Sequence, residues 1–148
     1  MKRITSWPQA VLGIAFSWGA LMGWAAERAS MEAPALLLFT GSIFWVIGYD
    51  TIYAHQDKED DALVGVRSTA RLFGSHTKKA LMVLYALALG FFAAAFATAA
   101  VPMPALAGLL AAGLHLFRQI KALDIDNPDQ CLALFKSNTM VGLLIFLG

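Results

Sequence analysis

The stretch WVIGYDTIYAHQDKEDDALVGVRSTARLFG, residues 45–74, joins a long apolar segment to a cluster of carboxylates and then to a basic run punctuated by glycine. Four aspartates and one glutamate lie within residues 50–61. Carboxylates at the edge of a hydrophobic helix are costly to keep, and residues kept there usually serve a function. A solvated connector between helices is the simpler alternative. Other features of the sequence are needed to distinguish it from a functional carboxylate cluster.

The composition indicates a membrane protein. The chain has 148 residues, of which 59% are hydrophobic and only 14% are charged, whereas soluble domains carry about 25% charged residues. Residues 10–26 and 33–49 contain no charged side chain, and neither does the run 80–117, which only VPMP at 101–104 interrupts. A bilayer core requires a helix of roughly 17–25 apolar residues. These runs therefore predict several transmembrane helices.

The fold expected is an all-α transmembrane bundle of four full spans plus a truncated fifth. The last apolar stretch, 139–148, is only about 15 Å long as a helix, or half a span. The segment VRSTARLFG, which ends at Gly74, predicts a short amphipathic helix. The four full spans are expected at about 8–26, 33–54, 79–100 and 105–120.

Lysine and arginine predict the orientation of the bundle. Ten of them fall on the side that holds the carboxylate cluster, and only Arg28 falls on the other side. By the positive-inside rule, the cluster faces the cytoplasm, or the matrix if the protein is mitochondrial. A net charge of +1 gives no indication of nucleic-acid binding.

The spacing of the aspartates predicts a metal site. If the helix continues beyond residue 49, Asp50, Asp57 and Asp61 fall within roughly 40° of one another, with Tyr53 to one side. Asp57 and Asp61 would lie about 6 Å apart along the axis. Mg²⁺ binds through one or two carboxylates plus the phosphates of a substrate. Four basic residues could steady such phosphates, namely Arg67, Arg71, Lys78 and Lys79. This pattern suggests a substrate with a diphosphate head and an apolar tail.

The same stretch resembles the second aspartate-rich motif of the UbiA-type intramembrane prenyltransferases, whose DxxxD core corresponds to Asp57 and Asp61. Its spelling, YDTIYAHQDKEDDALVGVRSTARLFG, is most similar to the branch that prenylates 4-hydroxybenzoate. The opening MKRITSWPQAVLGIAFSWGALMGWAA and the final FKSNTMVGLLIFLG also resemble segments of that branch's C-terminal half. The family's first motif, NDxxDxxxD, does not occur in this sequence. We therefore expect residues 1–148 to be the C-terminal part of a nine-helix enzyme, and to be inactive alone.

The resemblance implies a reaction and a set of roles. A polyprenyl group would pass from polyprenyl diphosphate to 4-hydroxybenzoate in ubiquinone synthesis, at a bacterial or mitochondrial inner membrane. Asp57 and Asp61 would bind Mg²⁺ and diphosphate. Arg3 would contact diphosphate or the aromatic carboxylate. Substrate-binding roles are implied for Asp50, Tyr53 and Arg67.

Three alternatives stay open. A menaquinone, haem or chlorophyll branch of the same superfamily would use the same motif on another acceptor. A non-catalytic membrane remnant is compatible with the missing first motif. A small transporter or channel subunit would use the acidic cluster as its mouth, although the spans at 8–26, 79–100 and 105–120 carry no carboxylate.

Three further features have structural interpretations. GALMG at 19–23 places two glycines four residues apart, which predicts close helix packing. His115 is expected to form a hydrogen bond within the bundle. DIDNPD at 124–129 is expected to form a solvated turn, because Pro128 interrupts any shared face.

Overall fold

Helices form all the regular structure in the computed structural model, which describes residues 6–65 and 67–147. Within these residues there is no strand, so the predicted all-α fold is confirmed. The elements in chain order are α1 (Pro8–Arg28), α2 (Ala33–Ala54), α3 (Lys58–Leu63), α4 (Thr69–Phe73), the 3₁₀ turn η1 (Gly74–His76), α5 (Thr77–Thr98), α6 (Pro104–Ala122) and α7 (Pro128–Leu147).

Four segments of the described chain are long and apolar enough to cross a membrane: Pro8–Arg28, Ala33–Ala54, Thr69–Thr98 and Pro128–Leu147. They identify the chain as a membrane protein. The remaining long helix, α6, carries Arg118 and Lys121 near its end and packs against α5 and α7. The helices predicted at 8–26, 33–54, 79–100 and 105–120 agree with α1, α2, α5 and α6 to within about two residues at each end. The full span predicted at 105–120 is not among the four candidate spans, because Arg118 and Lys121 lower the hydropathy of α6.

The last helix differs from the prediction. It begins at Pro128 instead of residue 139, so α7 has 20 residues and the half-length fifth span is wrong. The Oδ1 of Asn127 accepts a hydrogen bond from the N–H of Gln130 at 3.0 Å and caps the start of the helix. Ser137 and Asn138 bond to side chains of α6 and α2, which allows polar residues to lie within this helix.

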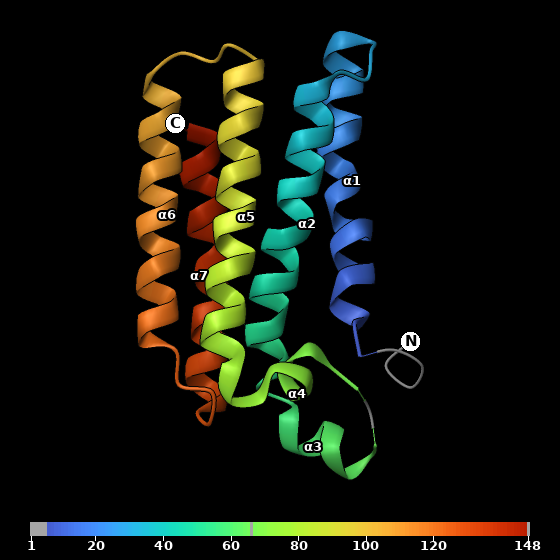
Figure 1. Ribbon diagram of the computed structural model, residues 1–148, viewed down its shortest axis with the longest axis vertical. Helices are drawn as coiled ribbons and strands as arrows, with labels where there is room; N and C mark the ends of the chain where they lie inside the picture. The colour runs from blue at the N-terminus through green and yellow to red at the C-terminus, as the bar shows by residue number, and fades with distance from the viewer. Residues whose placement is uncertain (1–5, 66, 148) are drawn as a thin grey trace.

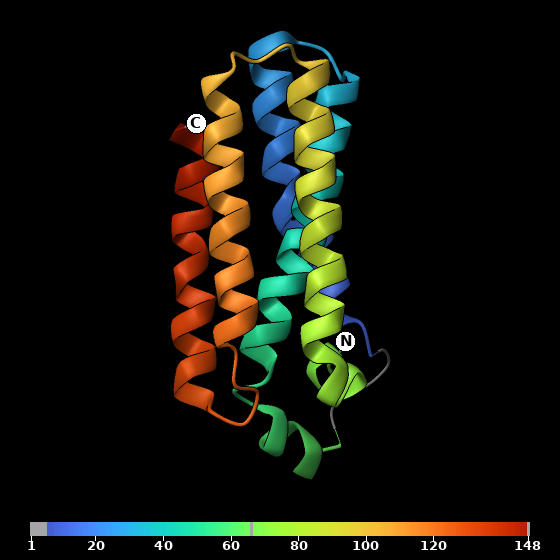
Figure 2. The ribbon, with the colours of Figure 1, turned by 60° about the vertical axis from the view of Figure 1, so that its left-hand side comes forward.

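The long helices stand side by side (Figure 1). Helix α1 packs on α2, α2 also packs on α5 and α7, and α6 contacts α5 and α7. The α1–α2 and α5–α6 turns lie together at one end, while α3, α4 and the α6–α7 loop lie at the other (Figures 1 and 2). The aspartate cluster is therefore at the end that holds the basic residues.

Glycines on α2 allow this helix to pack closely against α5. A Cβ on Gly48 of α2 would overlap the Tyr85 ring of α5, and one on Gly41 would lie 2.8 Å from Phe92. In contrast, a Cβ on Gly19 or Gly23 would meet nothing within 4 Å. Within the described chain, the prediction that the GALMG glycines pack closely against another helix is therefore wrong.

The short amphipathic helix is confirmed as α4. The Ser68 hydroxyl accepts a hydrogen bond from the N–H of Arg71 at its start, and Gly74 closes it with a φ of 48°, a conformation that glycine adopts without strain.

Candidate functional site

The carboxylate cluster lies where α2 ends, and the chain does not continue there as one helix. Residues 55–57 form a turn between Ala54, the last residue of α2, and Lys58, the first of α3. The predicted common face for Asp50, Asp57 and Asp61 required an uninterrupted helix and is therefore wrong. Asp50 remains on α2, where it is half-buried.

The turn is fixed by His55, which is buried. Its Nε2 lies 2.9 Å from the Thr77 Oγ1, and that hydroxyl donates its proton to the Gly74 carbonyl at 2.7 Å. Because a hydroxyl has one proton, Nε2 of His55 is the donor. This bond links the end of α2 to the start of α5.

The second ring nitrogen of His55, Nδ1, is buried and has no hydrogen-bond partner in the described chain. Burial, with a smaller contribution from the nearby charge of Lys58, lowers the pKa of His55 to about 4, and Asp126 partly opposes the shift. The imidazole is therefore neutral near pH 7 and serves as a structural link.

Asp57 and Asp61 keep the predicted one-turn spacing. The N–H of Asp61 donates to the Asp57 carbonyl at 2.8 Å, which is the i to i+4 bond of a helical turn. Asp61 is 8% exposed, and the Nη1 of Arg71 donates to its backbone carbonyl at 3.2 Å. Among the described side chains, which do not include those of Glu59 and Asp60, no three His, Cys, Asp or Glu groups form a metal-binding site. Two carboxylates one turn apart are a donor set that Mg²⁺ accepts when phosphates supply the other ligands.

A polar pocket of about 270 Å³ lies beside α4. Arg67 and Arg71 line it, two of the four basic residues predicted to steady phosphates. The other lining residues are Ser6, Gly65, Ser68 and Leu72. Two guanidinium groups in one small pocket suit the oxygens of a phosphate or diphosphate, since each presents several N–H donors in a planar fork.

Three polar residues place α4 against the bundle. The Oε1 of Gln9, on α1, accepts a hydrogen bond from the N–H of Thr69 at 3.2 Å. The hydroxyls of Thr51 and Thr69 lie 2.7 Å apart, and Thr51 donates to the Ile47 carbonyl. This network was not predicted from the sequence. The available signal was a glutamine and a threonine within apolar helices, where polar side chains are costly to keep.

Tyr53 belongs to an aromatic wall between α2 and α7. Its ring centroid lies 4.8 Å from that of Phe135, which also contacts Tyr49 at 5.6 Å. One turn before Tyr49 on α2, the Nε1 of Trp45 donates a hydrogen bond to the Asn138 Oδ1 at 3.0 Å. A cavity of about 340 Å³ lies against this wall. The α7 residues were not predicted, because Phe135 and Asn138 lie more than 80 positions from Tyr53 along the chain.

The remaining predictions concern residues around the site. Asp126 is 81% exposed, which agrees with a solvated turn at 124–129, but its Oδ1 lies 3.7 Å from the Lys58 Nζ, so the turn also contacts α3. The Nε2 of His115 lies 3.2 Å from the Ser137 Oγ, which confirms its bundle role. Arg3 lies outside the described residues.

Comparison with known proteins gives consistent results. The sequence matches the UbiA prenyltransferase family over residues 1–145. It is 48% identical to the mitochondrial 4-hydroxybenzoate polyprenyltransferase of Bos taurus, 49% to that of Drosophila melanogaster and 45% to that of Homo sapiens. Each alignment covers 100% of this chain but only 38–40% of the relative. No solved structure matches. The chain spans about two-fifths of these relatives, and it belongs to the UbiA prenyltransferase family.

Proposed function

We propose that this chain is part of a membrane enzyme that transfers a polyprenyl group from polyprenyl diphosphate to 4-hydroxybenzoate, a step of ubiquinone synthesis. The observation that carries the proposal is the pair Asp57 and Asp61 on one helical turn, held by Arg71 at the polar end of an apolar bundle. The names of the relatives supply the acceptor and the donor.

The arginines would act on the leaving group. Arg67 and Arg71 line one pocket, and their charges would bind the diphosphate oxygens and stabilise the negative charge that develops as the allylic C–O bond breaks. The two electrons of that bond leave with diphosphate. The ring carbon ortho to the hydroxyl of 4-hydroxybenzoate then forms the new C–C bond and loses its proton.

Asp57 and Asp61 would hold Mg²⁺, because hard carboxylate oxygens one turn apart fit this ion and leave positions for phosphate oxygens. When bound, the ion would supply additional charge neutralisation for diphosphate. The phosphate oxygens of the substrate would supply further ligands.

Substrate positioning is proposed for the groups near the pair. Tyr53 is 36% exposed and packs on Phe135, so its ring offers a π face for an allylic cation. Asp50 lies on α2 less than one turn before Tyr53 and would contact the acceptor. Arg3 would contact diphosphate or the carboxylate of 4-hydroxybenzoate.

We place the protein in a bacterial or mitochondrial inner membrane, with the aspartate end on the cytoplasmic or matrix side. The support is the excess of lysine and arginine at that end.

The test is a hybrid enzyme in which this chain replaces the matching segment of the Drosophila melanogaster relative, assayed in membranes with both substrates and Mg²⁺. Asp57→Asn and Asp61→Asn are each expected to lower the rate about 100-fold or more, because each removes charge stabilisation at the leaving group. Asp129→Asn is the matched control, since it removes the same charge from an exposed position at the start of α7.

Equal rates for Asp57→Asn, Asp61→Asn and Asp129→Asn would refute the site. A hybrid that prenylates a different aromatic acceptor would refute the choice of 4-hydroxybenzoate and keep the site. An independent measurement is Mn²⁺ binding to the chain in the presence of inorganic diphosphate, followed by electron paramagnetic resonance; only the first two variants should weaken it.

A further inference from the structure

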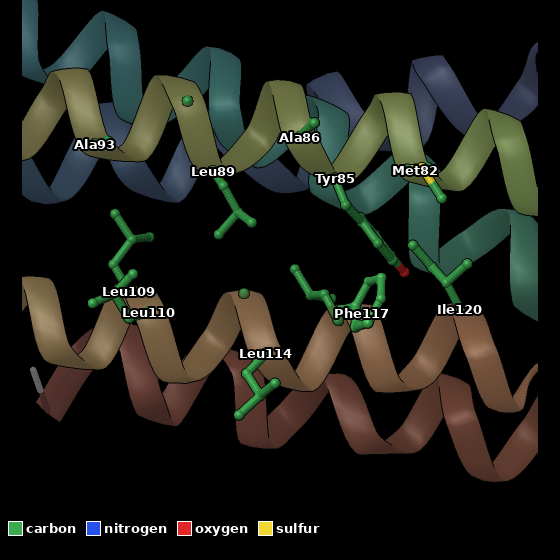
Figure 3. A pocket seen from close by; sticks show the side chains of 13 residues that line it. Met82, Tyr85, Ala86, Leu89, Ala93, Leu109, Leu110, Leu114, Phe117 and Ile120 are labelled. Carbon is green, nitrogen blue, oxygen red and sulfur yellow. The ribbon is translucent and has the colours of Figure 1, made fainter.

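A groove with an apolar lining lies between α5 and α6 (Figure 3). Its volume is about 670 Å³, within the range of roughly 300–1,000 Å³ typical of ligand sites. Leu110 and Met82, which line it, are 76% and 54% exposed, so the groove opens to the outside of the bundle. Its lining is almost entirely apolar, as a surface in contact with lipid hydrocarbon is.

The inner wall of the groove is closed. Tyr85 points from α5 toward α6 (Figure 3), and its hydroxyl donates to the Gln119 Oε1 at 2.9 Å. Both residues are 2% exposed. This bond lies between the groove and the interior of the bundle, so the groove is open on the outer face of α5 and α6.

The length of the groove fits one leaflet. Its lining runs from Met82 to Ala93 on α5, and from Leu109 to Ile120 on α6. Each range has eleven steps of 1.5 Å, or about 16 Å. The hydrocarbon core of a bilayer is about 30 Å thick, so one leaflet is about 15 Å. The groove therefore matches an extended acyl chain of a single leaflet.

One end of the groove is basic. The Nζ of Lys121 lies 4.7 Å from the centre of the Phe117 ring, which lines the groove. Lys78 is exposed and lies one helical turn before Met82 on α5, at the same end of the bundle. Basic groups between transmembrane helices at the membrane surface bind anionic lipid head groups.

We infer that this groove binds one anionic phospholipid, with an acyl chain along α5 and α6 and its phosphate between Lys78 and Lys121. The inference is independent of the proposed prenyl transfer, because it uses neither the pair Asp57 and Asp61 nor the pocket lined by Arg67 and Arg71. It commits to a lipid of the bilayer and not to a further protein segment or a prenyl chain.

The test is native mass spectrometry of the purified 148-residue chain in micelles that contain equal amounts of phosphatidylglycerol and phosphatidylcholine with identical acyl chains. We expect one bound lipid, with phosphatidylglycerol preferred. Lys121→Gln should weaken phosphatidylglycerol binding about fivefold, the effect of one surface charge on an anionic lipid, and abolish most of the preference. Lys136→Gln is the control, since it removes the same charge from an exposed position on α7.

A second variant tests the acyl chain. A Cβ on Gly90, which lines the groove, would meet nothing within 4 Å, so Gly90→Leu fills space without a clash. Each buried methylene is worth about fourfold in affinity, so displacing two of them should weaken both lipids about 15-fold. Gly23→Leu is the control: it is equally free of contacts but lies on α1.

Equal retention of the two lipids by the unmodified chain would overturn the head-group assignment. Gly90→Leu binding lipid as well as Gly23→Leu would overturn the groove. If a neutral polyprenol displaces the lipid and Lys121→Gln does not change lipid binding, the groove binds a prenyl chain instead, and the inference is refuted.

Discussion

Gly48 offers the sharpest test of how the bundle is packed. A Cβ at this position would lie 2.9 Å from Cδ1 and 3.1 Å from Cζ of Tyr85. The ring cannot move aside freely, because Tyr85 is 2% exposed and its hydroxyl is bonded to Gln119, which in turn donates to the Leu134 carbonyl at 2.8 Å. One added methyl group therefore strains contacts that join α2, α5, α6 and α7.

The magnitude follows from two opposing effects. Overpacking a tight interior costs about 1–3 kcal/mol. Replacing a helical glycine by alanine regains about 0.5–1 kcal/mol. Gly48→Ala should therefore be destabilising by up to about 2.5 kcal/mol. Gly19→Ala, on α1, where a Cβ meets nothing within 4 Å, should show only the gain.

The assay is reversible unfolding of the chain in mixed micelles by increasing sodium dodecyl sulfate, followed by circular dichroism. The two glycine variants should differ by about 1–3 kcal/mol, the overpacking cost alone. The same comparison in a Tyr85→Ala background should remove most of that difference, since the ring that clashes is gone. If Gly48→Ala is as stable as Gly19→Ala, the close contact of α2 with α5 is refuted.

Three smaller predictions concern the polar contacts. Gln9→Leu leaves the buried N–H of Thr69 without its acceptor, so it should cost about 1–3 kcal/mol and speed proteolysis between α3 and α4; unchanged cleavage would contradict the role of Gln9. Trp45→Phe removes the bond to Asn138 and should cost about 0.6 kcal/mol, the average for an interhelical bond within a membrane, measured by the same unfolding assay. Asp126→Asn breaks an exposed ion pair with Lys58 and should change stability by less than about 1 kcal/mol; a larger loss would mean that the α6–α7 turn holds α3 in place.

Much of the fold was predictable because it depends on local sequence. The charge-free lengths identify the spans, since a bilayer core sets how many apolar residues a helix needs. Ser68 and Gly74 delimit α4 through their own backbone and side-chain geometry. The one-turn spacing of Asp57 and Asp61 also survives, because it depends only on a short helical segment being formed.

The errors share a different cause. His55 ends α2 by bonding to Thr77, 22 residues away, so no local pattern indicates the break that removes Asp50 from the line of aspartates. The start of α7 was misplaced because its polar first half is stabilised by partners on α6 and α2. GALMG was given a packing role that falls instead to Gly13, Gly41 and Gly48, because which glycines meet a neighbour depends on how the helices face each other.

The sequence by itself therefore determined the class of the protein, its spans, its motif and its polar end, all of which follow from composition and short-range spacing. The tertiary structure alone decided that Gln9 and Thr51 hold α4, that Phe135 and Asn138 complete the wall beside Tyr53, and that a groove with a basic end lies between α5 and α6. These features join residues from different helices, and their positions depend on side-chain packing across the bundle, which spacing along one helix does not encode.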